Sequence, residues 1–375
     1  MKATTIALLG TLLLLPLAWM AAAADAKPSH GKGGRRKQQE QLAPCNDVPA
    51  HPLDVILGRP ARDAVTASVL AYRDAEGCIA YGTRPEALTE RTPPRAFKKG
   101  EPAEVVLGAL RPDTQYFYQL RAGETNGAAG TFHTQRPRGA AFTFTITADP
   151  HLDEHTSPEV LRRTLANARA DAPDFHIDLG DTFMTEKHAS REAAYKQYLA
   201  QRYYFGSLCS SAPLFLVLGN HDGENPRGRD EESNALAVWS CLTRKALFQN
   251  PEPGGFYTGN ASRHPEAGLL QDYYAWEWGD ALFVALDPHW YTRGARGQRD
   301  NWARTLGAEQ HQWLKRTLEG SQAKYKFVFI HHLVSGADEQ ARGGAAHQCT
   351  RLSYGPSATQ KRRRQRPRHQ QASQP

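Results

Sequence analysis

The chain has 375 residues, of which 40% are hydrophobic and 23% charged. This composition is that of a globular protein, and the length accommodates two ordinary domains, each with its own core. The net charge is +7, but eight of the 46 basic residues lie in residues 340–375, where no acidic residue occurs. The remaining 38 are balanced by 39 acidic residues. Residues 1–339 are therefore nearly neutral overall, and their charge gives no indication of a polyanionic partner. We expect no specific nucleic-acid binding.

The first residues predict export. Lys2 precedes an apolar stretch over residues 6–19, and small residues with two A-x-A cleavage candidates follow at residues 22–26. An apolar stretch of about 14 residues is short for a membrane span, which needs roughly 20. We therefore predict a cleavable signal peptide over residues 1–26, with a membrane anchor as the alternative. The mature protein would be secreted or periplasmic and would have no membrane span.

Residues 27–46, rich in Lys, Gly, Gln and Pro, predict a flexible linker. The five cysteines fit an oxidising compartment. Disulfides between Cys45 and Cys78, and between Cys209 and Cys241, are conceivable within the two expected domains, and Cys349 would remain unpaired. No pair has CxxC spacing, which argues against a thiolate metal site.

Residues 47–136 predict a small β-sandwich, because short apolar runs alternate with turn signals. In residues 65–71, small apolar side chains occupy every second position. The stretch from Leu110 to Tyr118 resembles the corner before a late strand of fibronectin-III-like domains, where an aromatic hydroxyl bonds back to the turn. We expect the tyrosines of this region to lie in the core, and none of its residues to be catalytic.

After a short hinge at residues 134–139, the pattern changes to alternating strands and helices over residues 141–345. We expect strands at 141–148, 175–179, 214–218 and 326–330, and a hairpin around Gly279 and Asp280. Helical spacing is present at 158–169, 192–203 and 309–318. The order predicts an α+β or α/β sandwich.

Polar residues follow each expected strand at the point where it ends: Asp149-Pro150-His151, Gly180-Asp181, Gly219-Asn220-His221-Asp222 and His331-His332. The carboxyl ends of strands form the crevice where α/β sheets bind ligands. Carboxylates, imidazoles and amide oxygens bind Zn, Mn or Fe, and a carboxylate can bridge two ions. Two ions clamp a phosphoryl group and activate a water.

The glycines before Asp181 and Asn220 would allow a sharp turn close to the ions. Taken singly, most of these motifs fit an ordinary turn or a core histidine, whereas their order together favours a metal site.

These motifs resemble the successive blocks of the calcineurin-like metallophosphoesterase superfamily. The β-sandwich in front makes the layout similar to that of purple acid phosphatases. The resemblance implies a four-layer αββα domain and a metal-dependent phosphoric ester hydrolase. It also implies two divalent or trivalent ions (Fe, Zn or Mn) that activate a hydroxide, and small-molecule phosphate mono- or diesters as substrates.

The resemblance further implies a role for each matching residue. The implied metal ligands are Asp149 and His151 for the first ion, Asp181 for both ions, and Asn220 and His331 for the second. His221 would contact the phosphate and either protonate the leaving oxygen or stabilise the charge that develops on it, and Asp222 would orient His221. His289 and His332 would line the pocket or serve the structure.

The sequence departs from the family pattern at two places. Met184 stands where purple acid phosphatases have an iron-binding tyrosine, which favours Zn, Mn or Fe(II). No Gly-His-x-His block follows His332, and residues 346–375 form a basic tail without strand patterns that predicts disorder. We hypothesise that the reading frame is lost near residues 345–349, which would truncate the domain; a natural basic tail is the alternative. The competing functional hypothesis is a catalytically impaired descendant that acts as a binding protein.

Overall fold

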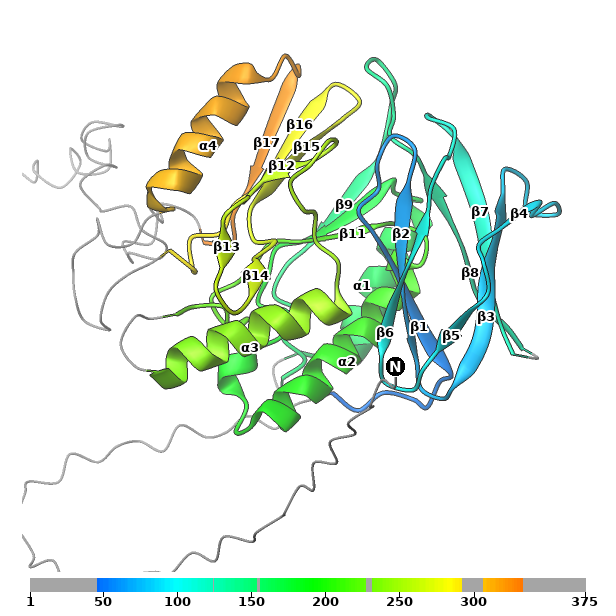
Figure 1. Cartoon of the computed structure of the whole chain (residues 1–375), viewed down its shortest axis with the longest axis horizontal. Helices are drawn as coiled ribbons and strands as arrows, with labels where there is room; N and C mark the ends of the chain where they lie inside the picture. Colours follow the sequence, from blue (N-terminus) through cyan, green and yellow to red (C-terminus); the bar gives the residue numbers. More distant parts are fainter. Residues whose placement is uncertain (1–45, 124, 154–155, 227–230, 292–305, 333–375) are drawn as a thin grey trace, which may run out of the picture. The chain divides into compact units, whose positions relative to one another are not determined.

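The computed structural model describes residues 46–123, 125–153, 156–226, 231–291 and 306–332 (Figure 1). The predicted signal peptide, nearly all of the predicted linker, the basic tail, Cys45 and Cys349 lie outside these residues. None of the helices in the described ranges has the length and apolar character needed to cross a membrane.

The N-terminal region consists of β-strands arranged in two antiparallel sheets. One sheet has the order β1-β2-β6, with β1 (Leu53–Gly58), β2 (Val65–Ala71) and β6 (Pro102–Leu107). The other has the order β4-β3-β7-β8, with β5 paired to β3. Its strands are β3 (Ala75–Gly82), β4 (Glu90–Arg91), β5 (Arg95–Phe97), β7 (Gln115–Ala122) and β8 (Thr125–His133). Alternate residues of β2 face a core shared by both sheets, as their spacing predicts.

The predicted corner is present in this region. The Arg111 backbone N–H donates a hydrogen bond to the hydroxyl of Tyr116 at 2.9 Å. Tyr116 and Tyr118 are both buried in the shared core, which confirms the prediction for these two residues. A closer relationship to fibronectin-III domains remains a prediction.

Two further sheets form the second region. The first has the order β11-β10-β9 and is parallel, with β9 (Phe144–Thr147), β10 (Phe175–Asp178) and β11 (Leu214–Leu216). The second has the order β12-β15-β16-β17, with β12 (Thr258–Gly259), β15 (Tyr274–Trp278), β16 (Ala281–Ala285) and β17 (Tyr325–Phe329). β15 and β16 form the predicted hairpin, and β16 and β17 are parallel. A small ribbon, β13 (Arg263–His264) and β14 (Gly268–Leu269), accompanies them.

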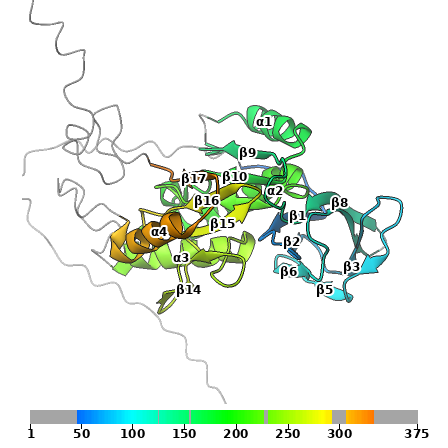
Figure 2. The same ribbon diagram turned by 90° about the horizontal axis from the view of Figure 1, so that it is seen from above.

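These sheets are the two inner layers of an αββα sandwich. An aromatic core lies between them, in which Phe215 stacks on Trp276 with ring centroids 3.9 Å apart. Helices α1 (Pro158–Ala170) and α2 (Arg191–Cys209) cover the outer face of the β9–β11 sheet. Helix α4 (Gly307–Gly320) covers the other outer face through Trp313 (Figure 2). Ser157 and Ser190 cap α1 and α2 through their hydroxyls, as N-cap serines do.

The second region differs from the sequence-based prediction in two respects. Helix α3 (Glu231–Leu247) lies in a segment where no element was predicted. The conceivable disulfide between Cys209 and Cys241 is not formed, because both are free thiols buried in different hydrophobic clusters. Cys78 is also free.

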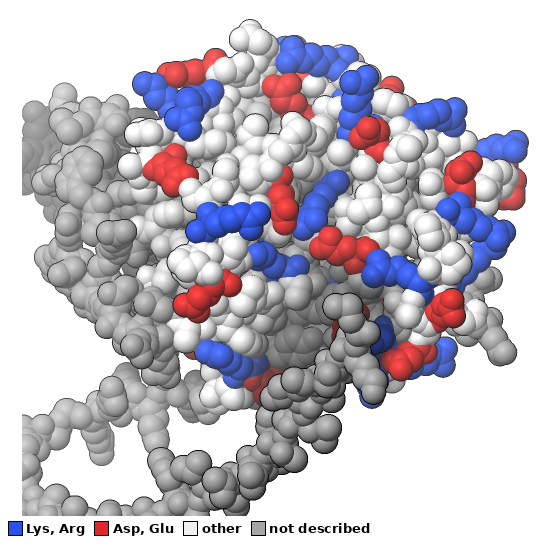
Figure 3. Space-filling model, in the orientation of Figure 1, with Lys and Arg blue, Asp and Glu red and all other residues white. Residues whose placement is uncertain are grey.

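The N-terminal sheet β1-β2-β6 packs directly on helix α2. Ile56 and Leu70 point away from the sandwich core and join the cluster formed by α1, α2 and the β9–β11 sheet. The hydroxyl of Tyr118 donates to the carbonyl of Ser210 at 2.7 Å. Basic and acidic side chains alternate over the face shown in Figure 3, and no large patch of one sign appears among its described residues.

Candidate metal centre

The candidate site lies where the parallel strands β9, β10 and β11 end. Asp149, Asp181 and Asn220 follow these strands by two to four residues, and their loops meet at Gly180 and Gly219. Gly180 has φ 98°, and a Cβ on Gly219 would lie 2.1 Å from the backbone nitrogen of Asp181. Only glycine permits this approach, so the predicted sharp turns before Asp181 and Asn220 are confirmed, and their closeness to the ions remains a prediction.

Both aspartates adopt a left-handed backbone conformation, with φ 56° at Asp149 and 55° at Asp181. Asp tolerates this region better than most residues, and such strain is typical of functional sites. Two hydrogen bonds hold the loops in place: Asp149 N–H donates to the Gly180 carbonyl at 3.0 Å, and His221 N–H donates to Asp181 Oδ1 at 2.8 Å.

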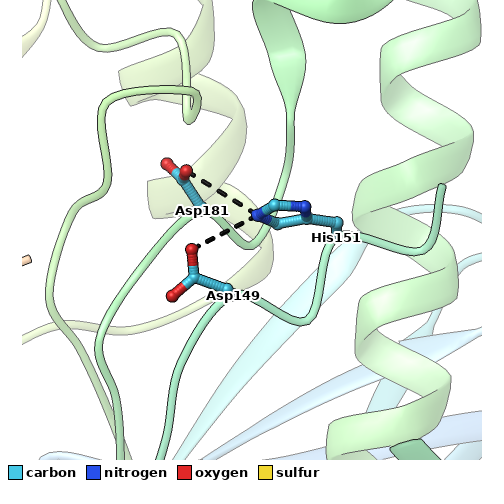
Figure 4. Close-up of side chains that lie close together, drawn as sticks. All are labelled: Asp149, His151 and Asp181. Atoms are coloured by element: carbon cyan, nitrogen blue, oxygen red, sulfur yellow. Dashed lines mark hydrogen bonds and ion pairs between the residues drawn. The ribbon is translucent and has the colours of Figure 1, made fainter. Parts of the chain in front are cut away.

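Asp149, His151 and Asp181 form a first donor group, whose ligand atoms all lie within 4.8 Å of one another (Figure 4). His151 Nε2 lies 3.3 Å from Asp149 Oδ1 and 3.7 Å from Asp181 Oδ2. Its other nitrogen, Nδ1, lies 3.4 Å from Asp153 Oδ2. A carboxylate behind the second nitrogen is the usual partner of a metal-binding histidine. The hydrogen bond to Asp181 raises the pKa of His151.

Asp181, Asn220 and His331 form a second donor group. His331 Nε2 lies 3.2 Å from Asn220 Oδ1 and 3.5 Å from Asp181 Oδ2. His331 Nδ1 donates to the Leu179 carbonyl at 2.8 Å, which fixes the tautomer that leaves Nε2 available as a ligand. Asp181 therefore belongs to both groups.

The pKa values of Asp181 and His331 depend strongly on each other. Burial alone would raise the pKa of Asp181, but hydrogen bonds to His151 and His331 hold it far below its usual range. Burial would lower the pKa of His331, but the bond to Asp181 raises it to about 9. The imidazoles of His151 and His331 both lie against the buried carboxylate of Asp181. The pocket therefore stabilises positive charge, as a cation site requires.

His221 lies beside the donor groups but has a different partner from the one expected. Its Nδ1 lies 2.6 Å from Glu186 Oε1, on the 3₁₀ turn η1 (Thr185–Lys187). Glu186, which no sequence motif indicates, is therefore the carboxylate that orients the ring.

The prediction that Asp222 orients His221 is wrong. The Asp222 carboxylate is buried and accepts four backbone N–H bonds, at 2.7–3.2 Å, from Asp181, Thr182, Phe183 and Gly219. It joins the two loops that carry Asp181 and Asn220, and so it acts on the site through the backbone.

Met184, His289 and His332 also lie near the centre. Met184 is buried, with φ 47°, at the start of η1, and its thioether is a poor ligand for hard ions. The His289 ring centroid lies 6.0 Å from that of His331 and 5.3 Å from that of His332. Burial lowers the pKa of His289 to about 3, so its imidazole is neutral.

The described residues thus form an αββα sandwich that carries two donor groups at the ends of its strands. The two groups share one carboxylate, that of Asp181. A family model described as calcineurin-like phosphoesterase matches residues 142–353, which is more than half of the chain. The chain belongs to the calcineurin-like phosphoesterase family.

Two solved structures share this fold at low sequence identity. One, "Structure of PhoD", has 17% identity and a TM-score of 0.54, and the match covers 73% of this chain and 61% of that chain. The other is purple acid phosphatase PPD1 from yellow lupin (Lupinus luteus) seeds, with 13% identity, a TM-score of 0.51, and coverage of 76% and 52%. The chain therefore spans about half to three fifths of these relatives. No curated protein matches the sequence.

Proposed function

We propose that the chain is an exported phosphoesterase that hydrolyses phosphate mono- or diesters at a two-metal site. The observation that carries this proposal is the position of Asp181, whose carboxylate is shared by the Asp149–His151 group and the Asn220–His331 group. A carboxylate between two sets of nitrogen and oxygen donors is the arrangement that bridges a pair of ions.

The donor set indicates which ions fit. It contains carboxylates, imidazoles and one amide, without thiolate or phenolate, and this favours Zn, Mn or Fe(II). Asp149 and His151 would hold the first ion, Asn220 and His331 the second, and Asp181 both. When bound, the pair would supply positive charge for the phosphoryl oxygens and a water of lowered pKa.

The residues outside the donor groups would move and position the proton. Glu186 accepts from Nδ1 of His221 and so leaves Nε2 as the nitrogen that can protonate the leaving oxygen. Asp222 would keep the Asp181 and Asn220 loops at the spacing that the ions need, through its four backbone bonds.

The fold supports the same reaction class, since the two structures named above are titled PhoD and a purple acid phosphatase. Residues 1–26 motivate the export part of the proposal. Export is tested by fractionating cells that express the full chain and by measuring the mass of the protein in each fraction. An unprocessed protein that is retained in the cytoplasm would contradict export.

A second candidate function is a catalytically impaired descendant that acts as a binding protein. It is favoured by the size of the donor set, since the described residues supply five ligands for two ions: Asp149, His151, Asp181, Asn220 and His331. Metal analysis and activity separate the two candidates.

The deciding experiment measures bound metal and hydrolysis of aryl phosphate mono- and diesters by the purified chain. Near two ions per chain, with turnover lost in His221→Ala and kept in His311→Ala, supports the enzyme. His311 is an exposed histidine of α4 and is the matched control. Less than one ion per chain and no turnover would leave the binding protein as the better reading.

A further inference from the structure

His289 reaches the site by the same structural route as His331. Strands β16 and β17 are parallel neighbours, and Ala285 is paired with Phe329. The pairing continues one residue further, because Leu286 N–H donates to the Phe329 carbonyl at 2.9 Å. The segments that leave the two strands therefore run to the same edge of the sheet, where ligands bind in such folds.

The turn that carries His289 is fixed by hydrogen bonds. Asp287 N–H donates to Gln310 Oε1 at 3.0 Å, and Gln310 Nε2 donates to the Asp287 carbonyl at 2.7 Å. Asp287 Oδ1 accepts the backbone N–H of His289 at 2.7 Å. The backbone of His289 is thus as firmly placed as a functional residue requires.

The side chain of His289, in contrast, has an unsatisfied nitrogen. The residue is 5% exposed, and its Nε2 is buried without a hydrogen-bond partner among the described residues. Buried polar atoms are nearly always paired, so such an atom needs an explanation, and the binding of a cation by this nitrogen is one.

His176 shows what a structural histidine looks like in the same protein. It is fully buried in β10, and its Nδ1 and Nε2 lie 2.8 Å and 3.0 Å from the hydroxyls of Thr145 and Thr147. Both nitrogens are satisfied, as they are in a histidine that serves only packing. His289 is nearly as buried but lacks this arrangement.

The distance to His331 is close to that of two imidazoles that bind one ion. Each nitrogen would lie about 2.1 Å from the ion and ~1.2 Å from its own ring centre, so the centroids would be about 5.4 Å apart at the tetrahedral angle. The observed separation is 6.0 Å. Among the described His, Cys, Asp and Glu side chains, only Asp149, His151 and Asp181 have all ligand atoms within 4.8 Å. Ligation would therefore draw the His289 ring closer to Asp181 and His331.

We propose that His289 is a ligand of the second ion through Nε2, beside Asp181, Asn220 and His331. The inference rests on the proposed two-metal function and adds a position outside the motifs that carry the family resemblance. It raises the protein donors of that ion from three to four, the number that tetrahedral sites use.

The test titrates Co²⁺ into the metal-free full chain and follows stoichiometry, both dissociation constants and the visible spectrum. In His289→Ala, we expect the second ion to bind at least ~10-fold more weakly, with the first ion unaffected. Added imidazole should restore part of the affinity and spectrum, which a merely structural loss would not allow. His133→Ala removes a buried histidine of the N-terminal sheets and is the matched control.

The outcomes separate this inference from the proposed function. Two ions in the wild type, with both constants unchanged in His289→Ala, would overturn the ligand assignment and leave the two-metal function intact. Fewer than two ions in the wild type would overturn both. If His289→Ala does not fold, His289→Asn, which keeps a polar side chain but is too short to reach the position of Nε2, must show the same selective loss of the second ion for the assignment to stand.

Discussion

Glu186 holds the ring of His221, and their side chains are only 22% and 25% exposed. Glu186→Gln keeps the shape of the pair but removes the charge. We expect kcat to fall by roughly 10- to 100-fold, which is part of the about 10²- to 10⁴-fold that a positioned general acid contributes. The loss should be larger for alkyl phosphates than for nitrophenyl phosphate, whose leaving oxygen needs no proton.

Bound metal, measured on the same samples, should not change in Glu186→Gln, since Glu186 is outside both donor groups. Glu192→Gln, an exposed carboxylate of α2, is the control. An equal loss for good and poor leaving groups would show that Glu186 acts on the fold of the site and not on the proton.

Asp178 lies behind the metal centre, fully buried, and accepts hydrogen bonds from the hydroxyls of Thr147 and Thr182. Burial raises its pKa to about 7, although both hydroxyls act in the opposite direction. The folded state thus binds a proton that the unfolded state releases at about pH 4. Its contribution to stability is present at low pH and is lost as the pH rises toward 7.

Asp178→Asn should remove this dependence. Urea unfolding in EDTA between about pH 4.5 and about pH 6.5 should give a wild-type free energy of unfolding that falls, relative to the variant, by about 1 kcal/mol per pH unit. The exposed Asp171→Asn variant should follow the wild type. Parallel curves for wild type and Asp178→Asn would contradict the assignment.

Single residues also show what the sequence could predict about the site. Asp149, Asp181 and Asn220 were predictable because each closely follows a strand, and strand ends converge. Glu186 was not, since it lies on a 3₁₀ turn with no pattern of its own. The predicted role of Asp222 was wrong because the sequence gives the position of a carboxylate in the chain, but not the direction in which its side chain points.

At the scale of elements, the loop after β11 depends on its glycine. A Cβ at Gly219 would lie 2.1 Å from Asp181 N and 2.3 Å from Asp181 Oδ1, so Gly219→Ala must push the two loops apart. We expect at least a ~10-fold loss of metal affinity and about 1–3 kcal/mol of lost stability. Calorimetric metal titration and urea unfolding measure both.

Gly206 in helix α2 provides the control. A Cβ there would meet its nearest atom, the Val55 carbonyl oxygen, at 3.7 Å, which is ordinary contact. Gly206→Ala should keep metal affinity and add about 0.5–1 kcal/mol of stability, as alanine does inside a helix. Equal metal affinity in both variants would show that the loop contact at Gly219 is unimportant.

A helix was predictable from the sequence where its buried residues are also its hydrophobic residues. In α1 the buried residues are Leu161 and Leu165, four apart, so the helical period is visible in the sequence. In α3 it is hidden, because Ser240 and Arg244 are fully buried while Leu242 is 45% exposed. Arg244 is compensated by a buried ion pair with Glu224, a long-range contact that no local pattern reveals.

At the scale of the whole described region, the N-terminal sheets and the αββα sandwich share a core. The alternation in β2 predicted one face of that strand, but not that Leu70 on the other face would pack against α2. Periodicity identifies which residues are buried together on an element. It does not identify the partner, which depends on shape and on polar contacts formed only in the folded chain.

Arg202 makes the polar part of that contact. It is fully buried in α2 and donates to Ser68 Oγ at 3.0 Å, to the Ser68 carbonyl at 3.1 Å and to the Leu247 carbonyl at the end of α3. Arg202→Met keeps much of the volume but leaves these acceptors unpaired. We expect about 2–4 kcal/mol of lost stability, since each unsatisfied buried acceptor costs about 1–3 kcal/mol.

The manner of unfolding tests whether the two regions act as one unit. Six of the seven tryptophans lie in residues 141–345, and the seventh, Trp19, lies in the predicted signal peptide. In the chain without residues 1–26, tryptophan fluorescence therefore reports only on the second region, whereas far-UV circular dichroism reports on both. If the shared core couples them, both probes give one midpoint in the wild type, and Arg202→Met lowers it for both. Arg163→Met, on the exposed face of α1, should change neither. Two separate midpoints in the wild type would show that the N-terminal sheets fold independently, and Arg202 would then stabilise an interface between two folding units.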